Sequence, residues 1–79
     1  MRILDEIRDN SVEQATLLLT RAEAEELHDS LQSLLENAKG QHVHISSNDY
    51  QKEITVAIYD PNHLDGFHPR CQKLIRENI

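Results

Sequence analysis

The sequence is poor in cysteine, which cross-links small domains through disulfides, and in glycine, which forms phosphate-binding loops. It contains one cysteine, Cys71, so no disulfide can form within the chain. A single cysteine fits a reducing compartment. The two glycines, Gly40 and Gly66, are far apart. This spacing excludes a glycine-rich phosphate-binding loop, which needs several glycines close together.

Long apolar runs are also missing. No segment approaches the roughly 18–20 apolar residues that cross a bilayer. The first ten residues include Asp5, Glu6 and Asp9, which a signal peptide would not carry among its apolar positions. We therefore expect a cytoplasmic protein.

Positive charge is scarce. Eight Lys and Arg residues face 14 Asp and Glu residues, for a formal charge of −6. Nucleic acids and anionic membranes bind basic surfaces, so neither is an expected ligand, whereas a basic protein would be attracted. The acidic patch at Glu25, Glu26 and Asp29 suits such a partner. It is better explained as a solvated helix start.

One helix is strongly marked. Thr20 and Glu23 have the spacing of a capping box, in which each side chain accepts from the backbone N–H of the other residue. Lys39 and Gly40 are typical of a helix C-terminus. We predict a helix over residues 21–38. Apolar residues recur along it at steps of three and four, at Ala24, Leu27, Leu31, Leu34 and Leu35.

Three segments have strand patterns. An apolar run ends at Leu19, residues 42–46 alternate, and residues 53–59 form the most apolar strand. Short helices are expected near residues 1–9 and from Pro69.

These elements predict one α+β domain over residues 1–79. Its three-stranded sheet, mixed or antiparallel, has β-α-β-β order, with the third strand central and antiparallel to the other two. The long helix packs on one face, and short helices lie at the two ends.

Five histidines stand out in so short a chain. Strand alternation places His42 and His44 on one side, close enough for two imidazoles to share a metal ion. The same alternation explains them as polar residues on the solvent-exposed face of a half-buried strand. We therefore expect no metal and no other cofactor.

Catalysis is not expected either. His63, His68 and Cys71 are near in sequence and could imitate a Cys–His nucleophile. Cys71, however, also continues the apolar stripe of the last predicted helix, with Leu74 and Ile75. A structural cysteine is the simpler interpretation.

Three strings between Leu18 and Tyr59 carry a likeness to known proteins: LTRAEAEEL, QHVHISS and KEITVAIY. In these strings the chain is similar to small uncharacterised bacterial α+β proteins. It also loosely resembles the immunity proteins that neutralise polymorphic toxins. The resemblance implies a non-enzymatic cytoplasmic binder whose acidic surface blocks a toxin, and it transfers no catalytic residue.

Three functions stay open. A protein-binding module, as an immunity protein or small regulator with a basic partner, fits the size and acidity. A self-associating structural domain is the alternative, and a metal-binding protein using His42 and His44 is a distant third.

Self-association is expected through the sheet face away from the long helix, which would expose Leu18, Ala57 and Tyr59 beside His42 and His44. The last helix, with Leu74 and Ile75, is a second candidate for the dimer surface. A chain this short has a marginal core, which a second subunit would complete.

We predict a homodimer at micromolar concentration. Sedimentation equilibrium should give a mass well above the 9.1 kDa of one chain, because a second subunit would bury the exposed apolar residues of the predicted sheet face. Glu25→Lys, on the solvent side of the long helix, should leave the dimer intact. A mass that stays at one chain as concentration rises would contradict the prediction.

Overall fold

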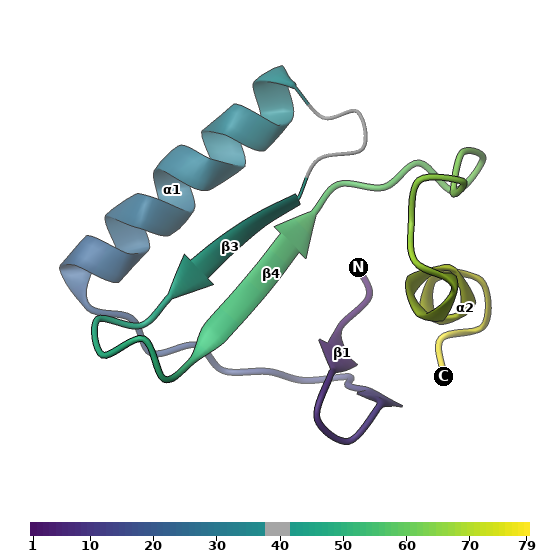
Figure 1. Cartoon of the computed structure of the whole chain (residues 1–79), viewed down its shortest axis with the longest axis horizontal. Helices are drawn as coiled ribbons and strands as arrows, with labels where there is room; N and C mark the ends of the chain where they lie inside the picture. The colour runs from purple at the N-terminus through teal and green to yellow at the C-terminus, as the bar shows by residue number, and fades with distance from the viewer. Residues whose placement is uncertain (38–41) are drawn as a thin grey trace. The chain divides into compact units, whose positions relative to one another are not determined.

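A computed structural model describes residues 1–37 and 42–79. Within this part the protein is α+β, with two helices and two separate two-stranded antiparallel sheets (Figure 1). The chain divides into two compact units. The central unit is Leu18–Ile58, and the terminal unit combines Met1–Leu17 with Tyr59–Ile79.

The central unit begins with α1, Arg21–Glu36, and the predicted capping box is confirmed. The N–H of Glu23 donates to the Thr20 hydroxyl over 3.2 Å, and the N–H of Thr20 donates to the Glu23 carboxylate over 2.8 Å. The helix ends at Glu36, and Asn37 is its C-cap residue, with a backbone N–H that donates to the Ser33 carbonyl. The stop predicted at Lys39 and Gly40 lies outside the described residues.

An antiparallel hairpin completes the central unit. β3, His42–Ser46, pairs with β4, Glu53–Ala57, so that Ile45 lies opposite Ile54. The helix runs alongside this hairpin (Figure 1). Leu34 of α1 is fully buried and Ile45 nearly so, and these two residues form the centre of the packing.

The predicted three-stranded sheet is wrong. β4 pairs with β3 and with no other strand among the described residues, so it is not central. The run that ends at Leu19 forms no strand, and Leu18 is 90% exposed. A short apolar run does not alternate, so its pattern cannot specify which face is buried or which strand it would pair with.

The terminal unit opens with a short hairpin rather than the predicted helix. β1, Leu4–Asp5, pairs antiparallel with β2, Asn10–Ser11. The Asp5 carboxylate accepts from the N–H groups of Ile7 and Arg8, over 3.0 and 3.1 Å. Aspartate often turns the chain in this way, and here the turn outweighs the helical spacing of the apolar residues.

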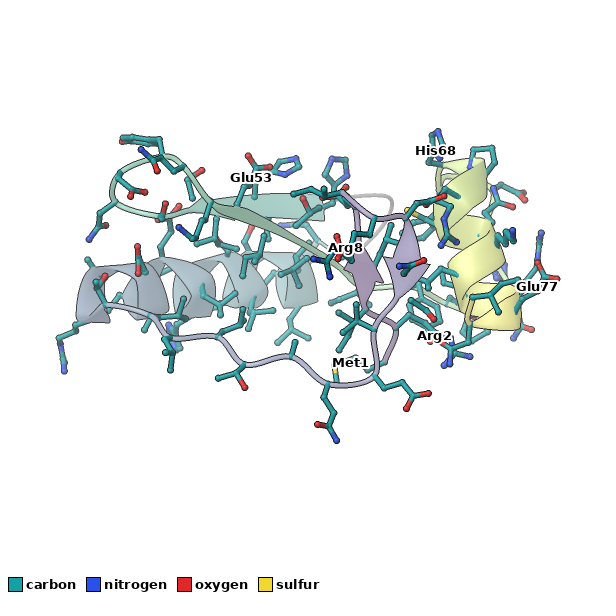
Figure 2. All side chains as sticks on the ribbon, turned by 90° about the horizontal axis from the view of Figure 1, so that it is seen from below. Met1, Arg2, Arg8, Glu53, His68 and Glu77 are labelled. Atoms are coloured by element: carbon teal, nitrogen blue, oxygen red, sulfur yellow. The ribbon has the colours of Figure 1, made fainter. Side chains whose placement is uncertain are left out.

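The last helix, α2, spans Pro69–Glu77 and begins at the predicted proline. Two arginines tie it to the N-terminal segment of the same unit. The Arg2 Nε donates to the carbonyls of Leu74 and Ile75 over 3.2 and 3.3 Å, and Figure 2 shows Arg2 beside α2. Arg70 pairs with the Asp9 carboxylate.

We predict that Thr20→Ala destabilises the protein by about 1 kcal/mol, because an N-cap hydroxyl is lost. The urea midpoint should fall without a large change in slope. Thr16→Ala makes the same chemical change at an exposed residue outside any helix or strand, and should have little effect. Equal midpoints for the two variants would argue against a stabilising cap.

Candidate functional site

The first candidate surface is that of α1, whose side chains fall into three rows. Residues spaced by four, three and four positions share a row on a helix. The buried row holds Glu23, Leu27, Ser30 and Leu34, which are buried or half-buried. The next row, called the apolar row, is exposed and mostly apolar and contains Ala24, His28, Leu31 and Leu35. The third row, called the acidic row, is exposed and mostly acidic and contains Glu25, Asp29, Gln32 and Glu36.

The apolar row corrects one expectation about the core. The sequence pattern placed Leu31 and Leu35 in one apolar stripe with Leu34, but of these three residues only Leu34 is buried. Leu31 is 39% exposed and Leu35 is 76% exposed. These two leucines are one helical turn apart, so they are neighbours on the surface. A water-exposed apolar strip therefore follows one flank of the helix.

The acidic row continues round the helix from this strip. Glu25 and Asp29 belong to the predicted acidic patch and are mostly exposed, as is Glu26 beyond them. Arg21 is the only basic residue of α1, and its guanidinium already pairs with Glu25 over 3.1 Å. The exposed side of α1 is therefore strongly negative.

A second candidate surface is the outer face of the hairpin. As alternation predicts, His42 and His44 lie on the same side of β3, with ring centroids 5.0 Å apart. The Nδ1 atom of His44 lies 2.8 Å from the Glu53 carboxylate and 2.9 Å from the Thr55 hydroxyl. Figure 2 shows Glu53 projecting from the hairpin on the side away from α1.

The other predicted surface residues do not form one sheet face. Leu18 precedes α1 in an extended segment and is not part of a sheet, Ala57 ends β4, and Tyr59 belongs to the terminal unit. Ala57 and Tyr59 are half-buried. The predicted homodimer remains a prediction, without the sheet face on which it was based.

The residues predicted on the last helix are largely internal to the terminal unit. Leu74 is 6% exposed and Ile75 is half-buried. Cys71 is also half-buried. The Nδ1 atom of His68 accepts from the N–H of Arg70 and caps α2, which gives His68 a structural role.

One structural connection near α1 could not be found from the sequence. The Glu23 carboxylate, besides capping α1, accepts from the N–H of Asn48 over 2.9 Å. Asn48 lies in the turn between β3 and β4, 25 positions away. Hydrogen bonds from the N–H groups of Thr20 and then Asn48 hold the pKa of Glu23 below its ordinary value. The helix start and the hairpin turn are therefore joined through one ionised side chain.

The part of the chain that the structure describes contains no cluster of three or more His, Cys, Asp or Glu residues arranged to hold a metal ion. In the same part, neither helix has the length and apolar character required to cross a bilayer.

Comparisons with protein-family models, curated proteins and solved structures found no match for this chain.

We predict that acid weakens the central unit through Glu23. Because its folded pKa is lowered, its stabilising effect is complete above the ordinary value of 4.5 and is lost as pH falls through the lowered folded pKa. Glu23→Gln should reduce the loss of stability between neutral and acidic pH, measured by urea unfolding.

Some acid dependence should remain in that variant. The Ser47 hydroxyl and the N–H of Gln51 also lower the pKa of Asp49 in the same turn. Glu26→Gln, a change at an exposed residue of the same helix, is the control, and its stability should depend on pH as that of the wild type does. A Glu23→Gln profile parallel to the wild type would contradict the assigned role.

Proposed function

We propose that this protein is a non-enzymatic protein-binding module, and that α1 binds a basic amphipathic helix of a partner protein. The observation that carries the proposal is the exposed apolar row of α1 lying directly beside its acidic row. A cytoplasmic location, and a role as an immunity protein or small regulator, belong to this proposal.

The apolar row supports a packed contact. Leu35 leaves 76% of its surface exposed, and Leu31 lies one turn before it. Burying a leucine side chain stabilises a complex by about 1.5–3 kcal/mol. The spacing of four, three and four along Ala24, His28, Leu31 and Leu35 suits the ridges of a second helix.

The acidic row supports the choice of partner. α1 carries five acidic residues against one basic residue, and the five include Glu25, Asp29 and Glu36. A partner helix with Lys or Arg beside its apolar stripe would meet opposite charge, which speeds association and fixes orientation. A second copy of α1 would bring like charges together, so self-association through this surface is disfavoured.

A designed amphipathic Lys/Leu peptide tests the proposal, with fluorescence anisotropy as the measurement and a Glu/Leu peptide of the same pattern as the control. The full-length protein should bind the basic peptide and not the acidic one. Leu35→Ser should weaken binding by about tenfold or more, because one leucine contact is lost. Added salt should weaken binding further.

Leu18→Ser is the matched control, because Leu18 is also highly exposed but precedes α1. Its affinity for the peptide should equal that of the wild type. Glu36→Lys, at the end of the acidic row, should weaken binding without removing any apolar contact. Equal binding by the wild type and Leu35→Ser would refute the proposal.

A further inference from the structure

The outer face of the hairpin brings two imidazoles together in a defined arrangement. The rings of His42 and His44 have centroids 5.0 Å apart and planes at 85° to each other. Both residues are exposed. This surface plays no part in the proposed binding by α1, so its chemistry can be considered independently.

The ring separation suits a shared metal ion. Imidazole nitrogens bind zinc at about 2.0–2.1 Å, and two imidazoles on one ion at right angles or tetrahedral angles have centroids about 4.5–5.2 Å apart. The observed 5.0 Å lies within this interval. The two ring centroids are therefore as far apart as those of two imidazoles bound to one ion.

Neighbouring side chains of β4 orient one of the rings. The Nδ1 atom of His44 lies within hydrogen-bond distance of both the Glu53 carboxylate and the Thr55 hydroxyl. With Nδ1–H donated to the carboxylate, the lone pair of Nε2 is free to bind an ion. Histidine ligands in metal sites are usually oriented by a carboxylate or carbonyl in this way.

We infer that His42 and His44 form a two-imidazole chelate for a divalent transition-metal ion, with Glu53 as the positioning residue. Water would complete the coordination, since the described residues contain no three-ligand cluster. Affinity for nitrogen ligands rises to Cu²⁺ and falls again at Zn²⁺. Cu²⁺ should therefore bind most tightly.

Calorimetric titration of the full chain with CuCl₂ at neutral pH tests this inference, with electron paramagnetic resonance to detect nitrogen ligands. The wild type should bind copper through nitrogen, and His42→Ala and His44→Ala should each abolish that binding. Both side chains are exposed, so the variants should fold, and urea unfolding will verify this. A Cys71→Ser background prevents reduction of the copper by the thiol.

His28→Ala is the matched control, because His28 is an exposed histidine that also contacts a carboxylate, that of Asp29, over 3.1 Å. It should bind copper as the wild type does. Glu53→Ala should weaken binding by about tenfold or more, and unchanged affinity would remove Glu53 from the site. Copper binding that survives both His42→Ala and His44→Ala would overturn the inference.

Discussion

The central unit depends on one ionised carboxylate. Glu23 accepts from the backbone N–H of Thr20 at the start of α1 and from that of Asn48 in the hairpin turn. A buried or half-buried N–H without an acceptor is costly, and this side chain satisfies two of them from segments far apart in sequence. The residue that begins the helix therefore also fixes the helix against the hairpin, and its burial in the innermost row of α1 sets which side of the helix faces the strands.

The surfaces available for binding follow from that orientation. A helix is about 10–12 Å wide with its side chains, whereas two strands lie about 4.8 Å apart. The hairpin therefore covers one row of α1, centred on Leu34, and leaves the row of Leu31 and Leu35 exposed. A third strand would have widened the sheet and covered more of the helix, but the expected strand before Thr20 does not form.

Sequence patterns predicted the structure correctly where the interacting residues are close together in the chain. The Thr20–Glu23 box and Pro69 specify helix starts through neighbours in the chain, and both predictions were confirmed. The alternation that places His42 and His44 together is equally local. The bond from Asn48 to Glu23 is a tertiary contact that no local pattern encodes. At the N-terminus two local signals competed, and the turn formed by Asp5 prevailed over the helical spacing of apolar residues.

The two proposed sites also differ in how the fold creates them. The α1 surface exists because a narrow hairpin leaves part of an amphipathic helix uncovered, so its use depends on the hydrophobic contact and opposite charge that a partner supplies. The histidine pair exists because every second residue of β3 points outward, and cross-strand neighbours on β4 then hold His44 in place. Glu53 and Thr55 reach the same ring nitrogen because the register places them diagonally and directly opposite His44. A hairpin can therefore pack its apolar face against a helix and, on the other face, orient polar side chains without any third strand.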